Sequence, residues 1–285
     1  MEISKVGVVG CGLMGGGIAQ VSAQAGFVTT VVEADQGLLD RGLGVIRRNL
    51  DGLVEKGRLD GRDRDSAWGR LRGSVQLEEL RQADLVIEAI TEDVGLKRDT
   101  FARLDQICPR GALLASNTSS CTVTELAAAT TRPAQVLGLH FFNPAPVMKL
   151  VEVVRTILTG DEAVRAAWGF VQALGKTPVA ATDTTGFIVN RLLVPYLLEA
   201  TRLLEAGIAS REDIDQAMKL GCGYPMGPFT LLDLVGLDTT LYVAEVMFAE
   251  FREPRFAPPP LLKRMVMAGQ LGRKSGKGFY DYSAK

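Results

Sequence analysis

The stretch KVGVVGCGLMGGGIAQVSAQAGFVTTVVEAD, residues 5–35, decides the fold. It begins with a valine-rich run that is typical of a buried strand, and LMGGGIAQVSAQ after it favours a helix. A second strand-like run, FVTTVVE, ends in an acidic residue. Gly10, Gly12 and Gly15 stand in GxGxxG spacing directly after the first run. Because a chain with 31 glycines produces such spacing by chance, the flanking strand, helix and second strand carry the interpretation.

This context indicates a dinucleotide-binding βαβ unit. Gly10 permits the tight turn, Gly12 lets the backbone approach a pyrophosphate, and Gly15 allows close packing of the helix. Glu33, at the end of the second strand, can accept hydrogen bonds from an adenosine ribose. Since a carboxylate repels a 2′-phosphate, we expect NAD rather than NADP. The alternative is a glycine-rich loop that binds no ligand.

Strand-like and helix-like segments continue to alternate after this unit. ADLVIEAITED (83–93) and ALLASNTSS (112–120) resemble strands, and a helical, charged segment at 37–72 precedes them. The alternation predicts an α/β fold, a Rossmann-like, doubly wound and mostly parallel sheet with a helical excursion. Ligands of such sheets bind at the carboxyl ends of the strands. The polar residues expected at these ends are Glu92, Ser116, Asn117, Ser119 and His140.

The only histidine of the chain, His140, stands close to a carboxylate in HFFNPAPVMKLVEVV, residues 140–154. Two strand-like runs joined by a stiff FNPAP connection could bring His140 and Glu152 side by side. A carboxylate on one ring nitrogen fixes the tautomer and raises the basicity of the other nitrogen, as a general base for a hydroxyl proton requires. The alternative is a hydrogen-bonded core histidine and an unrelated, exposed glutamate.

The pattern changes near residue 184 to long apolar helical segments without a strand signal. We therefore predict a Rossmann-like domain at 1–183, which binds NAD, and an all-α domain at 184–285. The apolar helix at 187–204 is either a domain core or a subunit interface. Asn190 within it needs a polar partner, because a buried amide without one is costly.

Composition excludes several classes of protein. The 32 basic and 33 acidic residues give a net charge of −1, whereas nucleic-acid and membrane-surface binding need a basic excess. The four cysteines are scattered without paired spacing, which predicts neither a metal site nor disulfides. No apolar run is long enough to span a bilayer, and the N-terminus leaves no room for a signal peptide. We expect a cytoplasmic protein.

Seven segments, taken together and in order, resemble the L-3-hydroxyacyl-CoA dehydrogenase family, nearest to its short-chain 3-hydroxybutyryl-CoA branch. They are VGCGLMGGGIA, VIEAITEDVGLK, ASNTSS, HFFNPAPVMKLVEVV, TGFIVNR, GYPMGPFTLLDLVGLD and GRKSGKGFYDY. The resemblance runs from about residue 5 to residue 283 without large gaps. It departs from the family mildly at Glu33, where many members have the shorter Asp.

The resemblance implies a role for each matching position. His140 resembles the catalytic base and Glu152 its partner, while Ser119 and Asn190 resemble the groups that bond the reacting oxygen and the neighbouring thioester. Asn49 and Lys56 match the residues of the excursion that bind CoA. From its position near a helix end alone, Lys56 would be expected to be a solvated lysine. The implied NAD contacts are Gly10, Gly12, Leu13, Met14, Gly15, Glu33, Glu92, Lys97, Asn143 and Lys274. The family is typically dimeric through its C-terminal domain, so the resemblance also implies that residues 184–285 serve substrate binding and dimerisation.

The reaction that follows is the reversible, NAD-dependent oxidation of an L-3-hydroxyacyl-CoA to the 3-ketoacyl-CoA. One alternative keeps this chemistry but places the thioester on an acyl carrier protein. An alternative of another class is a non-enzymatic NAD-binding protein with a structural or regulatory role. The set Ser119, His140, Glu152 and Asn190 weighs against it, because a protein without a reaction has no chemical need for that set.

Overall fold

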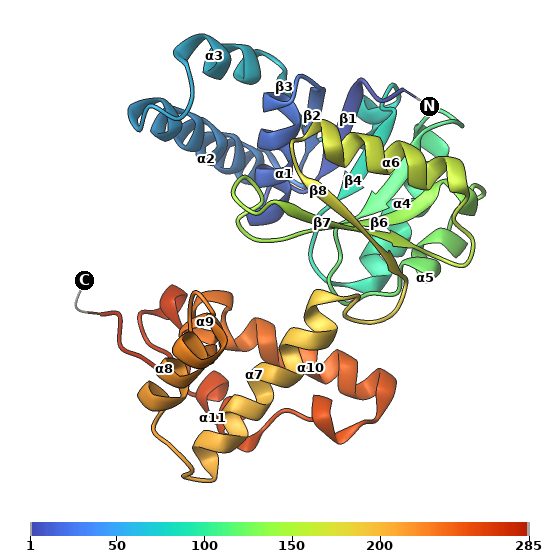
Figure 1. Cartoon of the computed structure of the whole chain (residues 1–285). Helices are drawn as coiled ribbons and strands as arrows, with labels where there is room; N and C mark the ends of the chain where they lie inside the picture. Colours follow the sequence, from blue (N-terminus) through green and yellow to red (C-terminus); the bar gives the residue numbers. More distant parts are fainter. Residues whose placement is uncertain (1, 284–285) are drawn as a thin grey trace. The chain divides into compact units, whose positions relative to one another are not determined.

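The computed structural model describes residues 2–283, which form two compact units, one up to Thr184 and the other from Thr185 (Figure 1). Unit 1 contains an eight-stranded sheet in the order β3-β2-β1-β4-β5-β6-β7-β8. Neighbouring strands are parallel except β6 and β7. The strands are β1 (Lys5–Val9), β2 (Val28–Val32), β3 (Leu71–Ser74), β4 (Leu85–Glu88), β5 (Leu113–Ser116), β6 (Val136–Phe141), β7 (Leu150–Arg155) and β8 (Thr177–Thr182).

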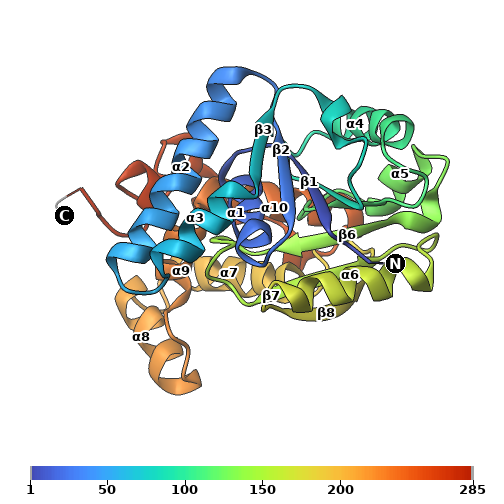
Figure 2. The same ribbon diagram turned by 90° about the horizontal axis from the view of Figure 1, so that it is seen from above.

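Helices cover both faces of this sheet, so the predicted doubly wound, mostly parallel fold is confirmed. α4 and α5 lie on one face, while α1 and α6 lie on the other (Figure 2). The helices of unit 1 are α1 (Leu13–Gln24), α2 (Gln36–Glu55), α3 (Gly61–Gly69), α4 (Val94–Ile107), α5 (Val123–Ala128) and α6 (Asp161–Ala173). Short 3₁₀ turns are η1 (Leu77–Leu80) and η2 (Pro133–Gln135).

Aspartates begin three of these helices. The side chains of Asp35, Asp60 and Asp93 accept hydrogen bonds of 2.8 Å from the backbone N–H groups two or three residues on. An N-cap of this kind satisfies one of the N–H groups that a helix leaves without a partner. The caps fix where α2, α3 and α4 begin, and those of α2 and α4 stand in the loops that follow the ends of β2 and β4.

The predicted helical excursion at 37–72 consists of α2 and α3, but its last residues were predicted wrongly. Leu71 and Arg72 belong to β3, which pairs with β2 at the edge of the sheet. The sequence LRGS of this strand has one apolar residue and a glycine, so it shows no alternation from which a strand could be predicted. Its pairing with β2, rather than its own propensity, makes it a strand.

Within residues 185–283, unit 2 consists of helices joined by turns and loops, without strands apart from isolated bridges near its end. Its helices are α7 (Val189–Glu205), α8 (Arg211–Cys222), α9 (Pro228–Val235), α10 (Leu237–Phe251) and α11 (Pro260–Met267), with η3 (Pro254–Phe256) and η4 (Arg273–Ser275). Two buried aspartates tie it together. Asp215 accepts from the backbone of Phe229 and Thr230 at the start of α9, and Asp233 accepts from the backbone of Phe279 in the tail.

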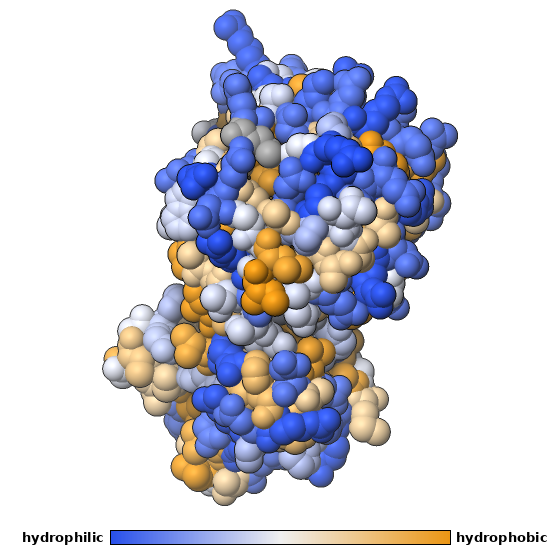
Figure 3. All heavy atoms as spheres, turned by 90° about the vertical axis from the view of Figure 1, so that its right-hand side faces the viewer, coloured by the Kyte–Doolittle hydropathy of each residue, from blue (hydrophilic) through white to orange (hydrophobic). Residues whose placement is uncertain are grey.

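The surface of the described residues mixes polar and apolar side chains. On the face drawn in Figure 3, hydrophobic residues form separate groups between hydrophilic ones. Within residues 2–283, no helix has the length and the apolar character needed to cross a bilayer.

Candidate active site

The glycine turn between β1 and α1 has two positions that the protein's own packing requires. Gly10 has φ +97°, and a Cβ there would lie 2.6 Å from the carbonyl oxygen of Ala89. A Cβ on Gly15 would lie 2.0 Å from the carbonyl oxygen of Gly10. At Gly12, by contrast, a Cβ would meet nothing within 4 Å. Packing therefore explains Gly10 and Gly15, while Gly12 leaves open space at the start of α1.

Glu33 lies immediately after β2 and faces this turn. Its Oε2 accepts a 2.7 Å hydrogen bond from the backbone N–H of Cys11, and its Oε1 accepts one of 2.7 Å from Ala34. These bonds hold the carboxylate at one orientation. Each carboxylate oxygen has a second lone pair, so Glu33 can still accept from a ribose diol. The open space at Gly12, the N-terminus of α1 and the fixed carboxylate fit a dinucleotide.

A pocket of about 780 Å³ extends from the glycine turn along α2. Its volume falls in the range of small-molecule sites. Four cationic side chains line it against one acidic side chain, Glu33, among the described residues, so it favours polyanionic ligands. Those cations are Arg41, Arg48, Lys56 and Arg58, and the predicted site residues in the lining are Gly12, Leu13, Glu33, Asn49, Lys56 and Asn143.

Arg41, Arg48 and Arg58 were not predicted as site residues. The lining residues Leu38, Arg41, Arg48 and Gly52 are separated by three, seven and four residues in turn. These spacings place them on one face of α2. That helical spacing was available in the sequence, but it does not say which face of α2 meets the glycine turn.

His140 and Glu152 form a buried pair. They stand directly opposite each other in the antiparallel pairing of β6 and β7, so their side chains share one face of the sheet. Nδ1 of His140 lies 2.6 Å from Oε2 of Glu152. Their residues are 5% and 0% exposed, and the ring of Phe142 lies 4.5 Å from that of His140. Because the carboxylate engages Nδ1, Nε2 is the ring nitrogen that can exchange a proton with a ligand.

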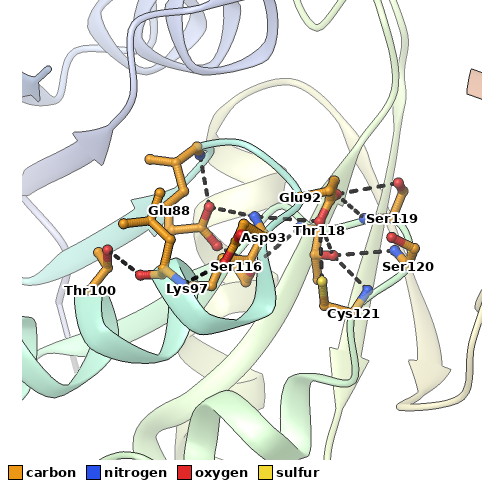
Figure 4. A network of polar contacts seen from close by, with 12 residues as sticks. Glu88, Glu92, Asp93, Lys97, Thr100, Ser116, Thr118, Ser119, Ser120 and Cys121 are labelled. Atoms are coloured by element: carbon orange, nitrogen blue, oxygen red, sulfur yellow. Dashed lines mark hydrogen bonds and ion pairs between the residues drawn. The ribbon is translucent and has the colours of Figure 1, made fainter. Parts of the chain in front are cut away.

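Ser119 lies in the loop after β5 and is hydrogen-bonded to the carboxylate of Glu92 (Figure 4). Oε1 of Glu92 accepts from the backbone N–H of Ser119 at 3.0 Å and from its hydroxyl at 3.4 Å. Oε2 accepts from the hydroxyl of Thr118 at 2.8 Å and from the thiol of Cys121 at 3.3 Å. Glu92 thus fixes the loop that carries Ser119.

Lys97 is buried beside this loop, with 1% of the residue exposed. Its Nζ donates to Oε1 of Glu88 at 2.6 Å and lies 3.5 Å from Oε2 of Glu92. Glu88 was not identified from the sequence. The signal that could have found it is an acidic residue in the strand LVIE, all of whose residues are buried, because a buried carboxylate needs a partner.

The loop after β5 also connects to the strand of His140. Asn117 accepts through Oδ1 from the backbone N–H of Phe141 at 2.9 Å, and Ser116 pairs with Gly138 in the sheet. The strand ends that carry Ser119 and His140 therefore lie side by side, as expected for neighbouring parallel strands.

The remaining predicted residues belong to unit 2. Asn190 is the second residue of α7 and is half-buried. Lys274 lies in η4, and its Nζ donates to Oδ2 of Asp238 at 2.6 Å.

The cysteines of unit 1 show no sign of activation. Burial, followed by the charge of Glu33, raises the pKa of Cys11 to about 11. Burial likewise raises the pKa of Cys121 to about 11. Both remain thiols near neutral pH, which makes them poor nucleophiles. Among the described residues, no group of three or more His, Cys, Asp or Glu side chains could hold a metal ion.

Comparison with known proteins agrees with this geometry. Residues 5–184 match the model of the NAD binding domain of 3-hydroxyacyl-CoA dehydrogenase, and residues 186–282 match that of its C-terminal domain. The 3-hydroxybutyryl-CoA dehydrogenase of Mycobacterium tuberculosis is 51% identical over 282 residues, which cover 98% of this chain and 99% of that protein.

Solved structures show the same similarity. FadB2 of M. tuberculosis is 51% identical with a TM-score of 0.97, covering 99% of this chain and 100% of that one. (S)-3-hydroxybutyryl-CoA dehydrogenase PaaH1 from Ralstonia eutropha is 43% identical with a TM-score of 0.95, covering 99% of each chain. The resemblance found in the sequence is thus confirmed. The chain belongs to the 3-hydroxyacyl-CoA dehydrogenase family.

Proposed function

We propose that the protein catalyses the reversible oxidation of an L-3-hydroxyacyl-CoA to the 3-ketoacyl-CoA with NAD. The observation that carries the proposal is the buried pair of His140 and Glu152, 2.6 Å apart, at the carboxyl end of β6. The family assignment supports the cofactor, because residues 5–184 match its NAD binding domain. Relatives named 3-hydroxybutyryl-CoA dehydrogenase support a short acyl chain such as 3-hydroxybutyryl-CoA.

In the proposed mechanism, His140 removes the proton of the C3 hydroxyl through Nε2. Glu152 holds the ring in the required tautomer and stabilises the imidazolium that forms. When bound, NAD supplies the acceptor for the hydride that leaves C3. In the reverse direction, protonated His140 returns the proton to the C3 oxygen. The low exposure of the pair strengthens its electrostatic interaction, because little water screens it.

The other site residues have supporting roles in this proposal. Ser119, with Asn190 of unit 2, bonds the reacting oxygen and the neighbouring thioester. The proposed NAD contacts comprise the glycine turn with Leu13 and Met14, together with Glu33, Glu92, Lys97, Asn143 and Lys274.

The two units divide the work in this proposal. Residues 1–183 bind NAD, and residues 184–285 contribute to substrate binding and dimerisation. Support for a homodimer comes from exposed apolar residues on the helices of unit 2, among them Leu192, which is 72% exposed. We further propose a cytoplasmic location, in line with the bacterial relatives.

The charge of the large pocket favours CoA over a carrier protein as the thioester group. Asn49, Lys56 and the arginines beside them surround a recessed space rather than a flat surface. A recessed basic pocket suits the phosphates of CoA, whereas an acidic carrier protein docks on exposed basic surface.

Oxidation of NADH at 340 nm with acetoacetyl-CoA tests this function. We expect turnover with acetoacetyl-CoA and a much higher KM for acetoacetyl groups on acyl carrier protein. The reverse order of preference would favour the carrier-bound substrate. If NADH binds but neither thioester is reduced, the enzymatic proposal is wrong and a non-enzymatic NAD-binding role remains.

A further inference from the structure

Glu88 is the most deeply buried carboxylate beside the loop of Ser119. It ends β4, and 0% of the residue is exposed. Three donors surround its carboxylate (Figure 4). Oε1 accepts from Nζ of Lys97 at 2.6 Å and from the backbone N–H of Ile90 at 2.8 Å, and Oε2 accepts from the hydroxyl of Ser116 at 2.6 Å. Glu88 therefore makes the full set of contacts that a buried carboxylate requires.

Two chains of contacts lead from Glu88 to the loop that carries Ser119. The first runs through Lys97, whose ammonium lies between Glu88 and Glu92, and then from Glu92 to Ser119. The second runs through Ser116, whose hydroxyl accepts from the backbone N–H of Thr118 at 3.1 Å. The carboxylate of Glu88 is thus linked to this loop by two separate sets of contacts.

Stability alone does not account for an ion pair at this place. Replacing a buried ion pair by packed apolar residues is often neutral or stabilising. The other residues of β4, Leu85, Val86 and Ile87, are apolar and buried. A pair that orders a neighbouring loop, however, uses its charge, because the carboxylate of Glu88 attracts and orients the ammonium of Lys97, which donates to it at 2.6 Å.

We propose that Glu88 is a positioning residue for the substrate-binding Ser119, acting through Lys97 and Glu92 on one side and through Ser116 on the other. This inference rests on the proposed function, since it takes Ser119 as a ligand of the reacting oxygen. Because 0% of Glu88 is exposed, the proposal gives it an indirect role rather than a contact with substrate or cofactor. Its removal shifts the Ser119 hydroxyl, and misplacement by about 1 Å can cost about 10²-fold in rate.

A double-mutant cycle on the full-length enzyme tests the proposal. E88Q, S119A and E88Q/S119A are compared by kcat and KM for acetoacetyl-CoA and by the Kd for NADH. We expect E88Q to lower kcat by about 10-fold or more. In the S119A background, we expect the same substitution to change kcat by less than about 2-fold, because the hydroxyl that Glu88 positions is already gone.

The control is D105N, which disrupts the partly buried ion pair of Asp105 with Arg132 and the hydrogen bond from Thr131 to Asp105, none of which involves the loop of Ser119. Its effect on kcat should be small and equal in both backgrounds. If E88Q does not fold, S116A replaces it, because this variant removes only the hydroxyl between Glu88 and Thr118. S116A should likewise lower kcat when Ser119 is present and change it little in the S119A background.

Equal losses of kcat from E88Q with and without Ser119 would overturn the proposal and leave Glu88 a structural role. A raised Kd for NADH with unchanged kcat would overturn it too, since the network would then serve the cofactor. Absence of turnover in the wild-type enzyme would be a different result, because it would refute the proposed function and this inference with it.

Discussion

Alanine substitutions at Gly12 and Gly15 should affect different properties, ligand binding and stability respectively, although the two glycines belong to one motif. At Gly15, the new Cβ would lie 2.0 Å from the carbonyl oxygen of Gly10, whereas ordinary contact begins near 3.4 Å. At Gly12, it would meet nothing within 4 Å, and φ −71°, ψ −163° suits alanine. G15A should therefore destabilise unit 1, whereas G12A should fold and bind NAD poorly.

The structure sets the size of each effect. Overpacking typically costs about 1–3 kcal/mol, and the high end applies to G15A because a backbone oxygen cannot rotate away. The gain in helix propensity offsets about 1 kcal/mol of this cost. We therefore expect a net loss of about 2 kcal/mol, or about 4–8 °C in Tm. For G12A, we expect a loss of stability below about 1 kcal/mol at the N-cap and an increase in the Kd for NADH of about 10-fold, or about 1.4 kcal/mol.

Thermal unfolding without ligand gives the stabilities, and titration of NADH fluorescence gives the Kd. A second check is the rise of Tm with NADH, which should be smaller for G12A than for the wild type at equal concentration. If G12A bound NADH with wild-type affinity, the claim that the dinucleotide lies close to the backbone at Gly12 would be wrong. Wild-type stability of G15A would refute the close packing of α1 on the glycine turn.

Three further predictions concern other parts of the chain. Burial would raise the pKa of Asp105, but hydrogen bonds from Thr131 and then Arg132 outweigh it and lower the pKa. D105N should therefore lower the free energy of unfolding by about 1–3 kcal/mol at pH 7. Chemical denaturation should show this difference persisting above about pH 4 and shrinking as the pH falls through the lowered folded-state pKa. K56M should raise the KM for acetoacetyl-CoA by about 3–10-fold, as expected for about 1 kcal/mol of lost phosphate contact, and leave the KM for acetoacetyl-pantetheine unchanged; an equal effect on both would remove Lys56 from the CoA site. L192D should convert the proposed dimer to a monomer in sedimentation experiments while keeping its helical circular dichroism, and an unchanged dimer would exclude this face of α7.

The features predicted from sequence are those that depend on local geometry. The turn around Gly10 and Gly15 was predictable because backbone conformation and close approach demand glycine there. The juxtaposition of His140 and Glu152 was predictable because the FNPAP connection returns the chain beside the strand it left. In both cases, the residues that decide the structure lie within about a dozen positions of each other.

What was missed depends on partners from distant elements. Glu88 receives its hydrogen bonds from α4 and from the end of β5, so no spacing within β4 identifies its role. β3 is a strand only because β2 pairs with it. The arginines of α2 line the pocket because of the way this helix packs beside the glycine turn, and the periodicity of α2 alone does not determine that packing.

The central claim is that His140, held by Glu152, transfers the proton of the C3 hydroxyl. The most direct test is the kcat of H140Q with saturating acetoacetyl-CoA and NADH, measured alongside its Kd for NADH. We predict that kcat falls by at least about 10²-fold while the Kd for NADH stays within about 2-fold of the wild-type value, because His140 lies outside the glycine turn. A kcat near that of the wild type would contradict the claim.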